Sequence, residues 1–309
     1  MKVKRFSLIF VGVLSLFLMF IFIVFSDIAS QSALYGINLC LYTIIPSMLP
    51  IFVLNGILLS SGFAFKLSGI IGKPFSKLFG INKIGAYPFI VGLICGCPAS
   101  LGAVSYLHEN GIIDSEESSN LSFICSNISP SFLAATVAAL ISSYKLGIAL
   151  YIIQVISNII IGFFMCRPLR KLKHKQKEKQ ISFKGHFSFS SSLKNALYSI
   201  GLICGSVIFF SSLSGMIMSI SSFPVTIKAI LISFFEITSA SNFISGYYDT
   251  RNAFLFLSAA VGWSGLSIYF QCSSVIKNNF PLKKYLTGKC ISSFLCLSMA
   301  KILLNILTK

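Results

Sequence analysis

The sequence predicts an all-α polytopic membrane protein, built as an inverted repeat with two re-entrant hairpins and two interrupted helices. Of its 309 residues, 55% are hydrophobic and only 11% are charged, whereas a soluble domain carries about 25% charged residues. The hydrophobic residues form continuous runs of about 20 residues, the length that an α-helix needs to cross a bilayer. Polar segments interrupt these runs at similar spacing in both halves, which is typical of the substrate site of a secondary transporter.

The first apolar run, 6–25, follows the basic residues Lys2, Lys4 and Arg5. It is longer than the hydrophobic region of a usual signal peptide. We therefore expect a retained membrane helix within residues 1–30, with a cytoplasmic N-terminus, and a cleaved signal peptide is the alternative. The remaining apolar runs are 34–63, 85–106, 121–141, 146–166, 196–221, 226–246, 253–276 and 285–307.

The positive charge of the chain lies mainly beside these runs. The formal net charge is +17, and the densest basic stretch falls within 167–195. Lys and Arg next to membrane helices favour the cytoplasmic side and attract anionic lipid headgroups. We interpret 167–195 as a basic cytoplasmic linker, with lipid headgroups rather than nucleic acid as its partner.

If every apolar run is counted as a membrane crossing from the N-terminus, basic segments fall on the side of the membrane where they are not expected. Two hairpins would remove this conflict. If every run crossed the membrane, the basic 167–195 stretch would lie outside, against the positive-inside bias. The run 85–106 contains Pro98 near its middle, so each arm reaches only about halfway across a 30 Å core. We interpret it as a re-entrant hairpin with its tip at 97–100.

The second half has the same conflict and the same solution. A hairpin over 226–246, with its tip at 236–241, returns the Lys277, Lys283, Lys284 and Lys289 segment to the cytoplasm. Each half then holds a helix, a hairpin, an interrupted helix and a final helix, and the two halves face in opposite directions. We predict two such repeats, 31–166 and 196–309. The alternative is that one run is a surface helix and the symmetry is accidental.

The polar interruptions supply the candidate substrate-binding residues. Backbone that leaves the helix inside a membrane must be covered by protein or line a cavity. In the first half the hairpin tip offers Cys97, Pro98 and Ser100, and the next run is broken at Asn127 and Ser129. The exposed N–H groups at such breaks suit an anion.

The second half offers an acidic hairpin tip and a serine-rich break. Glu236 is the only acidic residue deep in an apolar run, and a charge there costs at least about 2.5–3.5 kcal/mol on insertion scales. It is a candidate proton or cation site, or a substrate contact, and the alternative is a structural carboxyl that holds the tip. The further candidates are Thr238, Ser264, Gly265, Ser267 and Gln271.

No pattern in the sequence points to catalysis, a metal or a cofactor. Cys95 and Cys97 form the only close cysteine pair, and neither a histidine nor a second pair completes a zinc pattern. The runs hold no catalytic carboxylate pair and no Ser–His arrangement. We therefore predict neither an enzyme nor a metalloprotein. The pairs Gly92/Gly96 and Gly201/Gly205 predict close helix contacts.

The segments around these interruptions resemble a known family. Gly96-Cys97-Pro98-Ala99-Ser100, Ser126-Asn127 with Ser129-Pro130, Phe235-Glu236-Ile237-Thr238, and Gly265-Leu266-Ser267 with Gln271 resemble segments of the YlbJ-type sporulation integral membrane proteins. The resemblance spans about 34–305. It implies membership of the nucleoside-recognition, or Gate-domain, group, which is similar to concentrative nucleoside transporters.

The resemblance implies a secondary transporter of a small organic anion, dipicolinate being the first candidate, in the cell membrane or a forespore membrane. A nucleoside or other small-solute carrier of the same fold is one alternative, and a non-transporting membrane scaffold required for sporulation is another. The sequence does not choose between a coupling proton and another coupling cation, and it leaves oligomerisation open.

Overall fold

The computed structural model describes residues 2–168, 188–276 and 281–307, and every regular element within these ranges is a helix. The predicted all-α polytopic membrane class is confirmed. The predicted 167–195 linker lies largely outside the described residues, and helix α11 begins before its end, at Phe189. Helices long and apolar enough to cross a membrane cover Ser26–Ser60, Tyr144–Met165, Phe189–Ser219, Thr250–Val275 and Leu282–Leu307.

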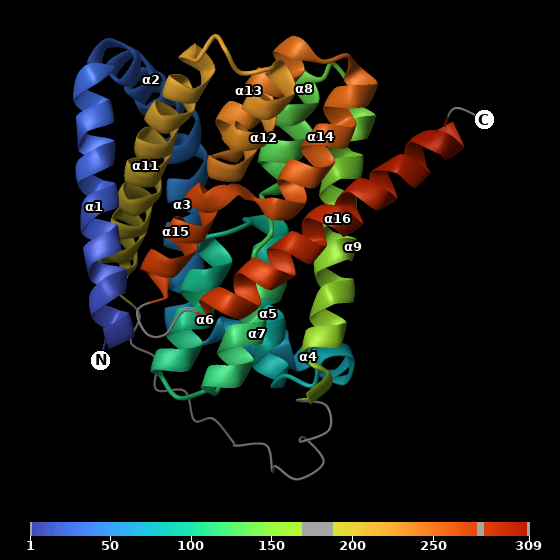
Figure 1. The fold of residues 1–309 in the computed structure, drawn as a ribbon. Coiled ribbons are helices and arrows are strands. Elements are labelled where there is room, and N and C mark those ends of the chain that lie inside the picture. The colour runs from blue at the N-terminus through green and yellow to red at the C-terminus, as the bar shows by residue number, and fades with distance from the viewer. Residues whose placement is uncertain (1, 169–187, 277–280, 308–309) are drawn as a thin grey trace.

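The first half opens with a long bent helix and a basic amphipathic one. After α1, the segments α2, η1 and α3 run without a break, and α4 then lies at one end of the molecule (Figure 1). This segment lies between the apolar runs 34–63 and 85–106, and Ser68, Gly72, Phe75 and Phe79 recur in it at helical spacing and are buried, so it folds as an amphipathic helix. The bounds are α1 Lys2–Val24, α2 Ser26–Leu39, η1 Cys40–Ile44, α3 Ile45–Ser60 and α4 Phe63–Phe79.

The hairpin expected at 85–106 is formed by two short helices that pack against each other. α5 and α6 extend about 14 and 17 Å at 1.5 Å per residue, half of a membrane core. Gly96, with φ +76°, lets the chain reverse between them. Tyr151 donates 2.5 Å to the carbonyl of Leu93, which satisfies the end of α5. The bounds are η2 Lys83–Gly85, α5 Ala86–Ile94 and α6 Ala99–Glu109.

The rest of the first half is an interrupted helix followed by a continuous one. α7 ends at Ile124, residues 125–129 leave the helix, and the chain becomes helical again at Pro130. The bounds are α7 Ser115–Ile124, η3 Phe132–Val137, α8 Ala138–Leu140 and α9 Tyr144–Met165.

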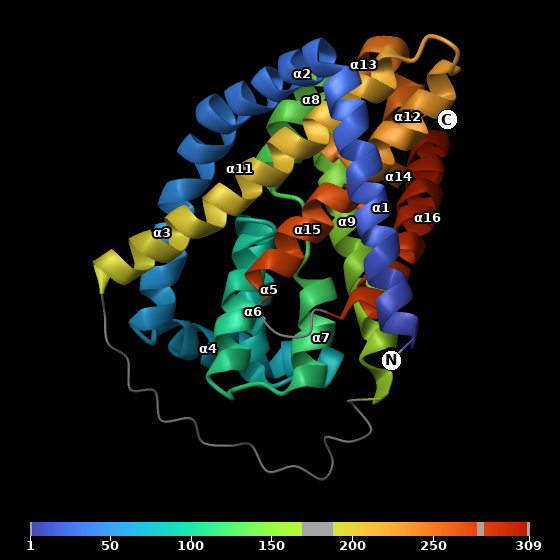
Figure 2. The ribbon, with the colours of Figure 1, turned by 60° about the vertical axis from the view of Figure 1, so that its left-hand side comes forward.

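The second half repeats this order in the opposite direction. α11 packs along α2 and α3, α12 and α13 form the hairpin expected at 226–246, and α14 and α15 form an interrupted helix (Figures 1 and 2). α16 packs against α14, where Gly262 lies on the backbone of Ser292 and Ser293. The bounds are α11 Phe189–Ser219, α12 Val225–Phe235, α13 Ile237–Tyr247, α14 Thr250–Trp263, α15 Gly265–Val275 and α16 Leu282–Leu307.

Several basic side chains lie on elements found toward the same end of the fold. α4 lies at the lower end of Figure 1, and the starts of α11 and α16 lie in the lower half. The predicted glycine contacts hold only in part. A Cβ on Gly92 would lie 2.6 Å from the Cys125 carbonyl oxygen, whereas Gly201 and Gly205 have nothing within 4 Å. The second glycine pair was therefore wrongly interpreted.

Candidate central site

Both hairpin tips reach the middle of the molecule, and each packs against the break in its own half. A Cβ on Gly96 would lie 2.7 Å from the Ser129 nitrogen, and one on Gly265 would lie 3.2 Å from the Phe235 carbonyl oxygen. Both glycines have positive φ, +76° and +85°. The close approach of tip and break thus depends on glycine in each half.

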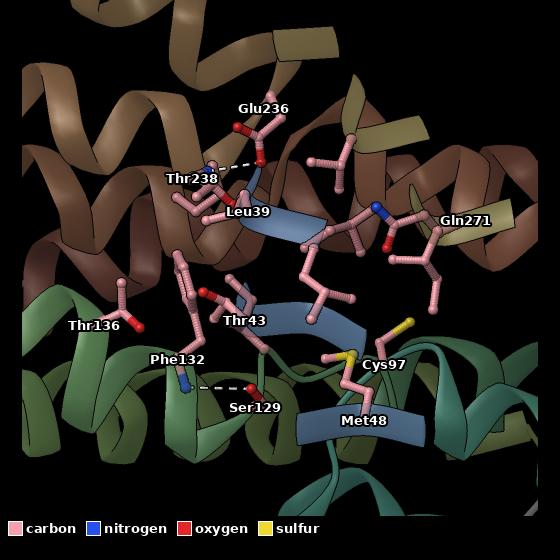
Figure 3. Close-up of a pocket in the computed structure, with 16 residues that line it drawn as sticks. Leu39, Thr43, Met48, Cys97, Ser129, Phe132, Thr136, Glu236, Thr238 and Gln271 are labelled. Atoms are coloured by element: carbon pink, nitrogen blue, oxygen red, sulfur yellow. Dashed lines mark hydrogen bonds between the residues drawn. The ribbon is translucent and has the colours of Figure 1, made fainter. Parts of the chain in front are cut away.

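A cavity of about 90 Å³ lies where these segments meet, which is room for several water molecules. Figure 3 shows Glu236 and Thr238 on one side and Ser129, Phe132 and Cys97 on the other. Apolar residues make up most of the wall. The polar and sulfur-bearing lining residues are Thr43, Met48, Cys97, Ser129, Thr136, Glu236, Thr238 and Gln271.

Glu236 closes the second hairpin through its own carboxylate. The residue is 2% exposed, and its two carboxylate oxygens accept 2.7 and 2.5 Å hydrogen bonds from the backbone N–H groups of Thr238 and Ser239. It therefore caps α13 and faces the cavity at once. The geometry is compatible with the structural and the functional interpretation of this carboxyl together.

The first hairpin tip separates two cavities. Cys97 lines the central one, whereas Pro98 and Ala99 line a second cavity of about 310 Å³. This second cavity lies between the last turns of α3, the start of α6 and the start of α11, where Asn55, Ser191 and Asn195 make it polar.

The predicted site residues divide into two groups. Cys97, Ser129, Glu236, Thr238 and Gln271 line the central cavity, and Pro98 lines the second one. The other predicted residues lie beside the cavity without lining it. These are Ser100, Asn127, Ser264, Gly265 and Ser267.

This second group satisfies polar groups of the breaks. Ser100 donates 2.8 Å to the Cys125 carbonyl, and Ser267 accepts a 3.1 Å bond from Gln271. Asn127 Oδ1 accepts a 2.8 Å bond from Asn158 Nδ2. Because broken helices free backbone and side-chain groups inside the fold, nearby polar residues are used to pair them.

The sequence interpretation missed three buried residues that hydrogen-bond to the breaks. Gln154 on α9 accepts a 3.1 Å bond from the N–H of Ile128 and donates 3.2 Å to the carbonyl of Val261, so it joins both interrupted helices. Asn158 lies one turn further along α9. The available signal was their spacing of four within an apolar run, since buried polar residues in membrane helices have partners.

The third missed residue is Lys289, and its interpretation as part of a cytoplasmic loop was wrong. Lys289 lies in the second turn of α16 and is 0% exposed. Tyr285, Lys289, Ser292 and Cys296 recur at helical spacing and are all buried, so this face of α16 points into the protein. Its ammonium donates 2.7 Å to the Ser126 carbonyl and 3.1 Å to Ser264 Oγ.

The two halves also touch directly at the first hairpin tip. The sulfur atoms of Cys97 and Cys272 lie 2.7 Å apart. Trp263 stacks on Phe234 with ring centroids 5.3 Å apart, and its indole N–H donates to the Phe234 carbonyl. The tryptophan therefore pins the second hairpin to α14 instead of lining the cavity.

Comparison with known proteins gives one significant relative among curated sequences. The chain is 24% identical over 203 residues to the sporulation integral membrane protein YlbJ of Bacillus subtilis (strain 168). The match covers 65% of this chain and 48% of that protein, so the chain spans about half the length of its relative. No family model matches the chain, and no solved structure matches it. The similarity supports the YlbJ-type resemblance of an integral membrane protein.

Proposed function

We propose that the chain is a secondary transporter of a small organic anion, with dipicolinate as the first candidate substrate. The observation that carries this proposal is the meeting of two hairpin tips with two helix breaks around a central cavity. Discontinuous helices in inverted repeats form the substrate sites of secondary transporters. A membrane scaffold has no evident need for irregular backbone at this depth.

The two cavities suggest how the solute would pass. The tip around Cys97 and Pro98 stands between the central cavity and the second cavity. A shift of this tip would join them, while the hairpin of the other half would close the opposite side. Movement of one repeat against the other around a fixed site is the usual basis of alternating access.

The lining suits a small planar acid in several respects. Phe132 and neighbouring aliphatic side chains offer an apolar surface for a ring, and Ser129, Thr238 and Gln271 offer hydrogen bonds. The helices that begin at Ala99, Pro130, Ile237 and Gly265 start near this centre, and helix N-termini favour negative charge. The relative's description as a sporulation protein makes a spore-associated acid the first to test.

An anion would meet a like charge in this cavity. Glu236 is the only charged side chain among its described lining residues. Like charges that share a buried site repel each other unless one binds a proton. We therefore propose that a proton enters with the substrate and neutralises Glu236.

The test is uptake by purified protein in liposomes. We expect labelled dipicolinate to accumulate, faster when the outside is more acidic, and nucleosides to enter slowly or not at all. Glu236→Gln should keep some exchange but lose the dependence on pH, because the amide carries no proton to exchange. Faster nucleoside uptake would favour the nucleoside carrier, and no solute uptake together with normal sporulation of Glu236→Gln cells would favour the scaffold.

The orientation of the fold is a further part of the proposal. The end that carries α4 and the starts of α11 and α16 would face the cytoplasm, because Lys and Arg next to membrane helices favour that side. The exposed Lys66, Lys73 and Lys77 on α4 would then contact anionic headgroups. Single cysteines at Lys66 and at Ser222 should differ in intact cells, with only the second labelled by an impermeant thiol reagent. Labelling of the first from outside would reverse the orientation.

A further inference from the structure

Lys289 is a charged side chain placed entirely inside the protein. None of its surface is exposed, and its ammonium hydrogen-bonds to the Ser126 carbonyl and to Ser264 Oγ at 2.7 and 3.1 Å. A buried ammonium is expensive unless other groups replace the water that it has lost. The residue therefore requires a specific explanation in a membrane helix.

The two oxygen partners come from the two helix breaks. Ser126 lies in the irregular segment 125–129 of the first half, and Ser264 is the left-handed residue between α14 and α15. One ammonium on α16 therefore bridges both interrupted helices. The rings of Phe123 and Tyr285, each with its centroid 5.7 Å from the Nζ atom, complete the surroundings.

No carboxylate in the described part of the chain pairs with this ammonium. The thiols of Cys97, Cys272 and Cys296 lie in its surroundings. A backbone carbonyl at an unwound segment and a hydroxyl at a helix break are thus its main ligands. Unwound carbonyls of this kind coordinate the coupling cation in transporters with discontinuous helices.

We propose that the Lys289 ammonium is a resident cation, occupying the position that a coupling sodium ion would take between the two interrupted helices. This inference rests on the proposed carrier function. Because this ammonium is covalently attached, it does not dissociate. It stabilises the two helix breaks without coupling transport to a sodium gradient. The wild-type protein would then be indifferent to sodium.

Removal of the side chain provides the test, because it should leave oxygen ligands around an unfilled space. We compare thermal unfolding of purified wild type, Lys289→Ala and Lys289→Met in sodium, potassium and choline chloride of equal ionic strength. Lys289→Ala should unfold at a lower temperature in choline and recover by about 2–4 °C in sodium, saturably. Lys289→Met should not recover, because its side chain fills the space. Lys301→Met, an exposed lysine of the same helix, should behave as wild type.

Specific and saturable stabilisation of the wild type by sodium would overturn the proposal, as would a Lys289→Ala protein that responds equally to all three salts. If Lys289→Ala cannot be purified as folded protein in any salt, the response of the wild type to sodium is the test. A wild-type melting temperature that does not depend on sodium supports the proposal. A different result would reject the carrier proposal. Liposomes that take up none of the tested solutes, while sodium restores Lys289→Ala, would keep the resident cation and reject the carrier. Sodium-driven uptake by the wild type would support the carrier and reject the resident cation.

Discussion

The two interrupted helices occupy equivalent places in the two halves, yet their backbones break differently. The first leaves the helix over residues 125–129, and partners far away in sequence pair its polar groups: Gln154 with the Ile128 N–H, and Lys289 with the Ser126 carbonyl. The second turns at Ser264 alone, whose N–H still bonds to Ala260. A longer break needs more help from other helices, because each freed group must be paired inside the membrane.

The hairpin tips differ in the same direction. The first tip turns through Gly96 and rests on the break of its own half, where the Cys97 N–H donates 2.7 Å to the Asn127 carbonyl. The second tip is capped by its own Glu236 carboxylate. The first tip is therefore held by a contact with another segment, whereas the second tip has a local cap from its own side chain. Four experiments would break or sharpen this contrast.

The largest effect is expected for Gly96→Ala. Its φ of +76° and the 2.7 Å approach to Ser129 leave no room for a methyl group, so strain of at least about 1–3 kcal/mol is added at the tip. We expect little folded protein by size-exclusion chromatography. Gly265→Ala, whose nearest neighbour would be 3.2 Å away, should be milder. Gly201→Ala in open helix surface is the control and should match or exceed wild-type stability. Equal damage at Gly96 and Gly265 would remove the contrast.

A covalent link between the halves should have the next largest effect. In a variant that keeps only Cys97 and Cys272, an oxidant should join the sulfurs, which lie 2.7 Å apart. A protease site inserted between the halves would reveal the link, because the two fragments would stay together until reduced. We expect solute uptake to stop on oxidation and return on reduction, since the first tip could no longer move. Cys95 paired with Cys272 is the control, and uptake unchanged by the link would show that this tip does not move.

Gln154→Ala tests the dependence of the first break on α9. The change leaves the Ile128 N–H without its side-chain partner and leaves the Val261 carbonyl with only the Ser264 hydroxyl as a side-chain donor, which should cost about 1–3 kcal/mol of unfolding free energy. Gln271→Ala is the matched control, because Gln271 lines the cavity and its side chain, within the described residues, hydrogen-bonds only to Ser267. We expect it to change uptake more than the melting temperature. The opposite pattern would mean that Gln271 holds the fold and Gln154 does not.

The smallest effect is expected at Asp249, which caps the N-terminus of α14. Its carboxylate accepts a hydrogen bond from the Asn252 N–H. Hydrogen bonds from the side chain and the backbone N–H of Asn252 lower the pKa of this exposed carboxyl below its ordinary 3.8. A lowered pKa adds stability above the unfolded-state pKa that is lost as the pH falls through the folded-state value. Asp249→Ala should therefore melt slightly below wild type at neutral pH, with the difference shrinking below pH 3.8. A difference that is constant with pH would mean that the charge contributes nothing.

The membrane class and the hairpins follow from the sequence because they depend on properties that are local in the chain. Hydrophobic length predicts helices, and Pro98 or Glu236 in the middle of a run disfavours an unbroken one. The preference of basic residues for the cytoplasmic side then requires the two hairpins. The same reasoning identified Cys97, Ser129, Glu236, Thr238 and Gln271, which line the cavity, as candidates before any contact was known.

The tertiary structure alone decides which polar residues face the cavity and which support the breaks. Ser100 and Asn127 look equivalent to Ser129 in sequence, but their side chains hydrogen-bond to the Cys125 carbonyl and to Asn158 and do not line the cavity. Lys289 lies near one end of an apolar run, where a cytoplasmic position was expected, and only the packing of α16 on α14 turns it inward. The reason is physical: a side chain's partners inside a membrane protein come from other helices, and their direction depends on how those helices pack.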